Sequence, residues 1–260
     1  MFRNLTRERY LPSPYSGIVK DPSAQFDYFK PGADGRDRYG NAFFPAIGHL
    51  AYFDREKKPV KPGLLVSPEG RQFMLQHRGV VKALDEVLES FRPASPKMII
   101  AGGITLEPLS IGSQSCVYFL ETREPAGRYV VKVPNTDSSE NVDQPYVYEM
   151  LQTQQISRDL GRMMWVRGLS LNRFLLASGQ VAIIRYEEGV QPDRGAIEER
   201  ARPLKEAIDS YISFQQTMGN SLWKNIKTDF EDRGVLRLDN FKAKPDGEIV
   251  WVDPFYYHAA

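Results

Sequence analysis

The chain has 260 residues, of which 42% are hydrophobic and 26% are charged, and its formal net charge at pH 7 is +1. This composition excludes wholesale disorder and collagen-like repeats, and the charge balance argues against a strongly basic nucleic-acid-binding protein. The single cysteine excludes an intramolecular disulfide and fits a reducing compartment. No apolar run approaches the roughly 20 residues of a membrane-spanning helix, and the N-terminus lacks a signal-peptide pattern. We therefore expect a soluble, cytoplasmic protein that does not bind membranes.

Residues 1–95 are predicted to form an N-terminal extension. Eight of the 18 prolines lie within the first 68 residues, and frequent prolines interrupt helices and central strands. Aromatic residues are also dense there, and they oppose disorder because they offer apolar surface to bury. We expect a loop-rich segment over residues 1–68 that packs on the rest of the protein. A helix is expected over residues 70–91, where apolar residues recur every three or four positions.

From residue 104 onward, the pattern predicts an ordered series of strands and helices. The expected elements are an antiparallel three-strand meander over 104–133, a helix over 146–161, a hairpin over 171–186, a long helix over 196–218, and two short strands over 240–243 and 248–252. A Pro-Asp-Gly turn separates the last two strands. Antiparallel strands followed by helices predict an α+β fold class.

Two parts of the meander carry residues suited to holding a nucleotide. Small residues around Gly112 allow backbone N–H groups to approach phosphate oxygens, although an ordinary hairpin turn explains them more simply. Lys132 lies among apolar strand residues, where an unpaired ammonium group is costly to bury. Phosphate oxygens would satisfy it, together with Glu149 on the following helix. The alternative is a solvent-facing lysine on an alternating strand.

The segment around the last two strands suggests a metal site. Asn240 and Asp253 flank the expected hairpin, and a tight hairpin brings its two ends together. An amide oxygen and a carboxylate would then meet near one point. Such oxygen ligands suit a magnesium ion shared with nucleotide phosphates. An ordinary hairpin without a metal is the alternative.

The order of these elements and motifs resembles the protein-kinase-like fold over residues 104–255, including aminoglycoside-phosphotransferase-like and small phage-encoded kinase-like proteins. The resemblance implies two lobes, with an antiparallel N-lobe sheet over about 96–189 and a truncated helical C-lobe over about 190–260. It implies ATP and magnesium as cofactors. It implies that Gly112 and Ser113 cover the phosphates and that Val117 packs against the adenine ring. It also implies that Lys132 binds phosphate oxygens and that Glu149 orients Lys132. Asn240 and Asp253 would bind magnesium.

The sequence departs from the family pattern at the catalytic loop. In H-R-D-L-x-x-x-N, the catalytic Asp lies five residues before the Asn, and here that position holds Val235. Asp239 and Asp232 are the nearby carboxylates that we consider as catalytic substitutes. Few residues follow Asp253, so we expect the usual substrate platform to be missing. We expect the extension over residues 1–95 to cover the surface that the missing helices would occupy.

Three interpretations remain open from the sequence. The first is a kinase-like protein that binds ATP and magnesium and transfers phosphate weakly to a hydroxyl of a protein or small molecule. The second is an inactive pseudokinase that binds a partner protein, which Val235 favours. The third is an unrelated α+β protein in which the motif matches are coincidental. Contact between Lys132 and Glu149 would distinguish the kinase-like interpretations from the third.

Overall fold

The computed structural model describes residues 36–45, 63–77, 80, 99–101, 104–112, 115–123, 126–134, 146–177 and 181–257. The chain forms two compact units. Unit 1 comprises Met1–Tyr148 and Phe174–Arg185, and unit 2 comprises Glu149–Arg173 and Tyr186–Ala260. The predicted α+β class is confirmed, because unit 1 contains an antiparallel sheet and unit 2 contains helices with short strands. The predicted domain limits stay predictions, and the two units divide the chain at other positions.

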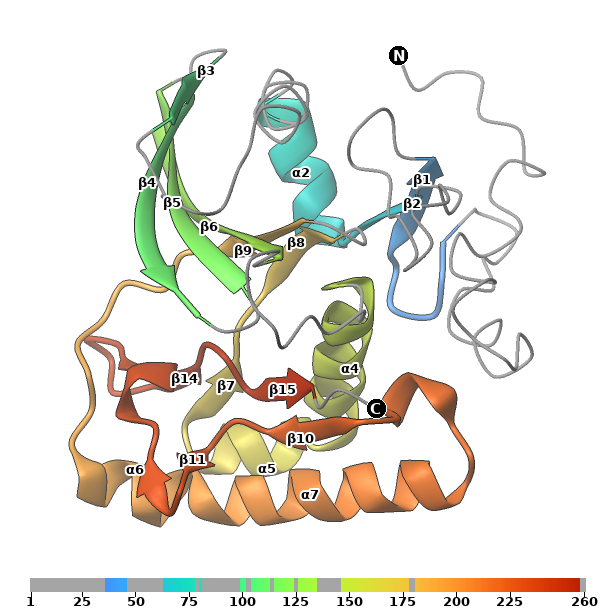
Figure 1. Ribbon diagram of the computed structural model, residues 1–260, viewed down its shortest axis with the longest axis vertical. Coiled ribbons are helices and arrows are strands. Elements are labelled where there is room, and N and C mark those ends of the chain that lie inside the picture. The colour runs from blue at the N-terminus through green and yellow to red at the C-terminus, as the bar shows by residue number, and fades with distance from the viewer. Residues whose placement is uncertain are drawn as a thin grey trace. The chain divides into compact units, whose positions relative to one another are not determined.

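An eight-stranded antiparallel sheet forms the framework of unit 1 (Figure 1). Its strands, in spatial order, are β1 (Ala42–Pro45), β2 (Gly63–Val66), β8 (Phe174–Ala177), β9 (Ala182–Arg185), β6 (Ala126–Pro134), β5 (Ser115–Arg123), β4 (Ile104–Ile111) and β3 (Ile99–Ala101). The expected meander is confirmed as β4, β5 and β6, and the expected hairpin as β8 and β9.

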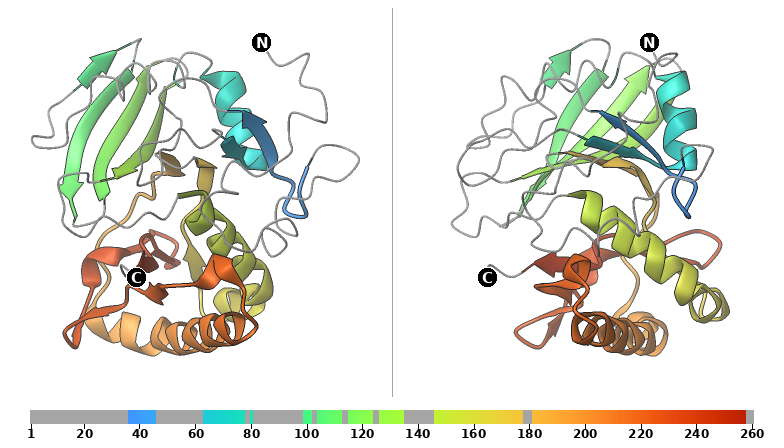
Figure 2. Two further views of the ribbon diagram at one scale, coloured as in Figure 1. Left: turned by 45° about the vertical axis from the view of Figure 1, so that its right-hand side comes forward. Right: turned by 90° about the vertical axis from the view of Figure 1, so that its right-hand side faces the viewer.

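The described part of the N-terminal extension builds onto this same sheet. Strand β2 pairs with β8, and β1 then pairs with β2, so the sheet continues past the predicted hairpin (Figure 2). Helix α2 (Pro68–Gln76) follows β2 directly, and Ser67 caps it by accepting a hydrogen bond from the Gly70 N–H at 2.9 Å. The described residues of the extension join unit 1, because the edge of β8 offers backbone groups that β2 satisfies. That the extension covers the surface of the missing helices stays a prediction.

The helix predicted over residues 70–91 is confirmed only at its start. Helix α2 ends at Gln76, since His77 has non-helical dihedral angles of −120° and 57°. Val80 is again helical, and the rest of that prediction, residues 78–79 and 81–91, lies outside the described residues.

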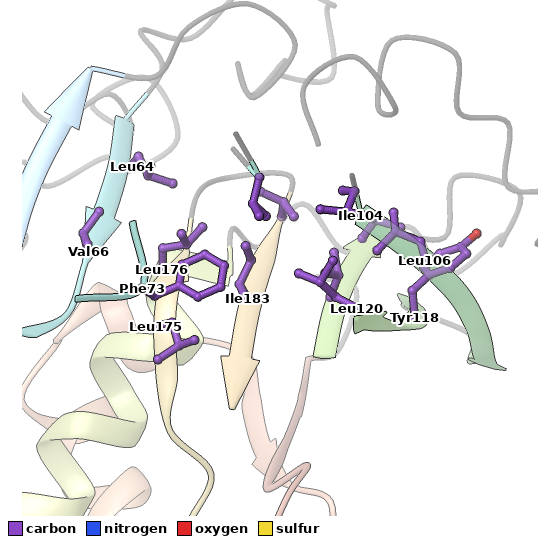
Figure 3. Close-up of a cluster of buried hydrophobic side chains, with 14 of the residues drawn as sticks. Leu64, Val66, Phe73, Ile104, Leu106, Tyr118, Leu120, Leu175, Leu176 and Ile183 are labelled. Atoms are coloured by element: carbon purple, nitrogen blue, oxygen red, sulfur yellow. The ribbon is translucent and has the colours of Figure 1, made fainter. Parts of the chain in front are cut away.

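One face of the unit 1 sheet carries the apolar core (Figure 3). Alternate residues of β4, β5 and β6 point to this face, as the period of two in a strand requires. Strand β8 contributes the neighbouring Leu175 and Leu176 because its register shifts there. The cluster includes Leu106 and Leu120 from the meander, Ile183 from β9 and Val66 from β2. Phe73 of α2 is 2% exposed and packs into the same cluster, so α2 covers this face of the sheet.

Unit 2 combines helices with short two- and three-stranded sheets (Figure 1). Its elements are α4 (Tyr146–Asp159), which begins in unit 1, then α5 (Gly161–Val166), β7 (Leu169–Leu171), α6 (Arg194–Arg200), α7 (Arg202–Thr217), the short 3-10 helix η3 (Ser221–Trp223), β10 (Ile226–Thr228), β11 (Glu231–Asp232), β12 (Val235–Leu236), the 3-10 helix η4 (Leu238–Asn240), β13 (Phe241–Ala243), β14 (Ile249–Trp251) and β15 (Phe255–Tyr257). Among the described residues, no helix is long and apolar enough to cross a membrane.

Three predictions for unit 2 can be compared directly with these elements. The helix over 146–161 is confirmed as α4, and the final hairpin is confirmed as β13 and β14. The single long helix over 196–218 is wrong, because it is divided into α6 and α7 at Ala201. Pro203, in the first turn of α7, supplies no N–H and favours a helix start at this point.

The close packing of α2 on β8 predicts that Gly70→Ala destabilises the protein. A Cβ atom at Gly70 would lie 1.7 Å from the Leu175 carbonyl oxygen, so the helix would have to move away from the strand. We expect the free energy of unfolding in urea to fall by about 1–3 kcal/mol. The matched control is Gly161→Ala at the start of α5, where a Cβ meets nothing within 4 Å. Equal stability of the two variants would show that α2 does not pack on β8 in this way.

Candidate functional site

Lys132 lies on the face of the unit 1 sheet that is turned away from the apolar core. On β6 it stands directly opposite Val117 of β5 and Ala182 of β9. Residues directly opposite in an antiparallel pair share a face. The residues on either side of Lys132, Val131 and Val133, belong to the core cluster on the other face. Lys132 is only 6% exposed, so its ammonium group is held largely away from water.

The first turn of α4 contacts this same face. The hydroxyl groups of Tyr146 and Ser115 are hydrogen-bonded at 2.8 Å, and Ser115 lies two residues before Val117 on β5, so the two share a face. Glu149 is one turn further along α4 and is 4% exposed, but it belongs to unit 2. The predicted pairing of Lys132 with Glu149 stays a prediction.

The turn between β4 and β5 contains Gly112, whose N–H donates to the Ser115 carbonyl at 2.8 Å. This bond closes the turn, so in this conformation the Gly112 N–H points into the hairpin. A Cβ at Gly112 would lie 3.4 Å from the Ser115 oxygen, an ordinary van der Waals contact. Ser113, the other residue predicted to cover phosphates, lies outside the described residues.

In unit 2, the backbone brings Asn240 next to the residues around Asp253. The Val252 N–H donates to the Asn240 carbonyl at 2.8 Å, and Asp253 is the next residue. The side-chain Nδ2 of Asn240 donates to the Asp229 carbonyl at 2.7 Å, which directs the carboxamide oxygen the opposite way. Asn240 itself is 4% exposed. The structure therefore holds the amide of Asn240 in a fixed orientation beside the segment that carries Asp253.

Two residues that the sequence analysis missed, Asp229 and Arg237, complete this part of unit 2. The Asp229 N–H donates to the Pro254 carbonyl at 2.9 Å, which places Asp229 beside Asp253 in the fold. The Arg237 guanidinium lies 3.3 Å from a carboxylate oxygen of Asp229 and 3.2 Å from one of Asp239. We call Asp229, Arg237, Asp239, Asn240 and Asp253 the acidic cluster.

The acidic cluster carries more negative than positive charge. Burial raises the pKa of Asp229, and the nearby carboxylates of Asp253 and Asp239 add to this, although Asn240 and Arg237 oppose it. The hydrogen bond to Arg237 lowers the pKa of Asp239, and the bond to Asp239 raises the pKa of Arg237. Two carboxylates, those of Asp229 and Asp239, thus contact a single guanidinium, and the charge of Asp253 adds to the negative potential, which an added cation would relieve.

The donor set of the acidic cluster fits magnesium better than a transition metal. Asn240 and Asp253 offer only oxygen ligands, which hard cations prefer. In the part of the chain that the structure describes, no three His, Cys, Asp or Glu side chains gather closely enough to form a metal site of their own. A magnesium ion held by Asn240 and Asp253 would therefore take further ligands from water and phosphate oxygens.

The other two candidate carboxylates and Val235 lie on the surface of unit 2. Strands β11 and β12 form a hairpin in which Asp232 pairs with Val235. Arg233 and Gly234 both have positive φ values, 50° and 79°, as the tightest hairpin turns require. The side chain of Asp239 is 68% exposed and is bound by Arg237. The roles of Asp232 and Asp239 stay predictions.

No protein-family model and no curated protein matches the sequence. Among solved structures, the chain is similar to PpkA-294 in its apo form, with 14% identity, a TM-score of 0.27 and coverage of 62% of each chain. It is also similar to the complex of Rv3197 with erythromycin from Mycobacterium tuberculosis, with 13% identity, a TM-score of 0.28 and coverage of 73% of this chain and 55% of that chain. The chain thus spans less than two thirds of either structure. TM-scores this low do not establish a shared fold, so the kinase-like resemblance rests on the chain's own element order and motifs.

The charge excess predicts that Arg237→Gln destabilises unit 2. Without the guanidinium, the carboxylates of Asp229 and Asp239 lose their cation and repel each other. We expect the free energy of unfolding to fall by about 1 kcal/mol at low salt, since Arg237 is partly exposed. The loss should shrink in about 1 M NaCl, where charges are screened over a few ångströms. Arg194→Gln is the control, because that side chain is 68% exposed and lies 3.9 Å from its partner Glu198. A loss independent of salt would contradict the electrostatic explanation.

Proposed function

We propose that the chain binds ATP together with magnesium in a protein-kinase-like site and transfers the γ-phosphoryl group to a hydroxyl of a protein or small molecule. The order of elements supports this proposal, since a meander, a helix, a hairpin, helices and a final short hairpin follow one another as in that family's pattern. The observation that carries it is the acidic cluster, where Asn240 is fixed beside Asp253 amid excess negative charge.

In this proposal, the residues singled out in the sequence keep the roles that the resemblance implies. Lys132 binds phosphate oxygens, Val117 packs against the adenine ring, and the Gly112–Ser113 turn covers the phosphates. Glu149 orients Lys132. Asn240 and Asp253 hold the magnesium ion, which neutralises charge on the phosphates during transfer. The burial of Lys132 supports its role, because a buried ammonium group needs anionic partners.

The alternative function is that of a pseudokinase that binds a partner protein. The specific observation in its favour is Val235, which occupies the family's catalytic Asp position by residue count and is 65% exposed. An exposed aliphatic side chain can neither accept a proton nor orient a hydroxyl. Under this alternative the protein binds nucleotide, or keeps only its fold, without turnover.

A thermal-shift titration with ATP, with and without magnesium, tests the proposed binding. We expect a magnesium-dependent stabilisation of wild type that reaches about 2.7 kcal/mol when ATP is at 100 times its dissociation constant. Asp253→Asn should remove the magnesium dependence, because the amide lacks the carboxylate charge. Glu206→Gln, at an exposed position of α7, is the matched control and should behave as wild type. If wild type shows no shift under either condition, nucleotide binding is refuted.

The role of Lys132 predicts that Lys132→Met weakens ATP binding without unfolding the protein. Methionine has a similar length and is easily buried, so the stability without ligand should be equal to or above that of wild type. The ATP-induced shift should be largely lost, because the charge on the phosphates is no longer paired. The control is Lys227→Met at an exposed position of β10. An unchanged ATP shift in Lys132→Met would assign the phosphates to other residues.

A further inference from the structure

The backbone fixes Asp229 at the same end of a small sheet as Asp253. Strands β10 and β15 pair antiparallel, with Thr228 opposite Phe255. Asp229 leaves β10 directly after Thr228, and Asp253 enters β15 two residues before Phe255. The Asp229 N–H donates to the Pro254 carbonyl, which continues the ladder by one bond. Asp229 and Asp253 therefore meet because their strands pair, although they are 24 residues apart (253 − 229) in sequence.

The residue after Asp229 anchors it firmly in unit 2. Phe230 is fully buried and contacts Trp251 and Phe241 edge-to-face, with ring centroids 5.5 and 5.7 Å apart. The Arg202 guanidinium lies over the same ring at 5.2 Å from its centroid. Such contacts fix the ring position tightly. The side chain of Asp229 retains 14% exposure, so a fixed carboxylate stays accessible at its edge.

The hairpin of β11 and β12 projects from the chain between Asp229 and Asn240. The Arg237 N–H donates to the Phe230 carbonyl at 2.9 Å and closes the base of the hairpin. Residues 231–236 thus form a loop of six residues (236 − 231 + 1) that starts and ends at one place. The separation of Asp229 from Asn240 is 11 residues (240 − 229), and without these six it is five. Five is the interval between the catalytic Asp and the Asn of the kinase loop.

We infer that Asp229, rather than a residue counted back along the sequence, is the catalytic carboxylate, and that the hairpin 231–236 is an insertion within the catalytic loop. This inference rests on the proposed function. The acceptor hydroxyl loses its proton to the Asp229 carboxylate while its oxygen forms a bond to the γ-phosphorus of ATP. The bond from that phosphorus to the β–γ bridging oxygen breaks, and its electrons leave with ADP. Arg237 holds the Asp229 carboxylate in place at 3.3 Å.

The other carboxylates are less suited to this role. Asp232 lies within the inserted hairpin, where it pairs with Val235 away from the closed base. Asp239 faces solvent, and both of its oxygens are bound by Arg237 at 3.2 and 3.3 Å. Val235 stands at the catalytic position only when the residues of the hairpin are counted. The presence of valine at position 235 therefore does not indicate whether the protein transfers phosphate.

The test measures ATP hydrolysis, with water as acceptor, alongside the magnesium-dependent thermal shift with ATP. We expect Asp229→Asn to lower kcat by about 10²–10⁴-fold, the usual effect of losing a general base. KM for ATP and the thermal shift should stay within about threefold of wild type, because the amide keeps the shape and both backbone hydrogen bonds. The control is Glu206→Gln at an exposed position of α7, which is expected to retain kcat within about threefold. A merely structural role of Asp229 would change the shift and KM together with kcat.

A second variant keeps the inference testable if Asp229→Asn does not fold. Val235→Asp restores an acid at the position given by residue count, on an exposed hairpin that tolerates it. We expect no change in kcat, whereas a rise of 10-fold or more would overturn the role of Asp229. Wild-type protein that binds ATP but hydrolyses none, or Asp229→Asn with wild-type kcat, would also overturn it and leave nucleotide binding intact. Absence of the thermal shift in wild type would refute the proposed function itself.

Discussion

The backbone hydrogen bond from Arg237 to Phe230 determines which residues of unit 2 can act together. By closing the hairpin of β11 and β12, it brings Asp229 and Arg237 into contact and leaves Asn240 within reach of the Asp229 carbonyl. The buried ring of Phe230 holds one side of this bond in an aromatic cluster. The acidic cluster is thus positioned by main-chain bonds and packing, and the ion pairs of Arg237 add a smaller contribution to stability. That arrangement is typical of sites in which geometry is fixed before a ligand binds.

The sequence predicted those parts of the fold in which long periodic patterns occur. The meander over 104–133, helix α4 and the hairpin of β13 and β14 each combine a clear period with a recognisable turn. The hairpin of β11 and β12 escaped because each strand has two residues, too few for a period to emerge. Its turn uses Arg233 at positive φ, where Asn or Asp is the usual signal. Counting residues across an unseen hairpin therefore led to Val235 and missed Asp229.

The N-terminal region shows a different limit of sequence analysis. Its prolines predicted loops, yet Pro45 ends the edge strand β1 and Pro68 begins α2. Proline is tolerated at both kinds of position, since an edge strand and a first helical turn need no N–H donor there. Composition alone shows how frequent proline is. It does not show whether the backbone needs an N–H donor at each position where a proline occurs. Only the pairing of β2 with β8 reveals that this region completes the sheet.

The acidic cluster also bears on the choice between an enzyme and a scaffold. Burial and the neighbouring carboxylates raise the pKa of Asp229, which means that its charged form is disfavoured by the folded structure. A protein needed only as a binding surface gains nothing from that cost, and an amide at position 229 would keep the same backbone bonds without it. Local arrangements that oppose stability are expected mainly where a function requires them. With the hairpin treated as an insertion, Val235 no longer favours the pseudokinase. The proposed role of Asp229 then rests on its fixed position beside Arg237 and the segment that carries Asp253.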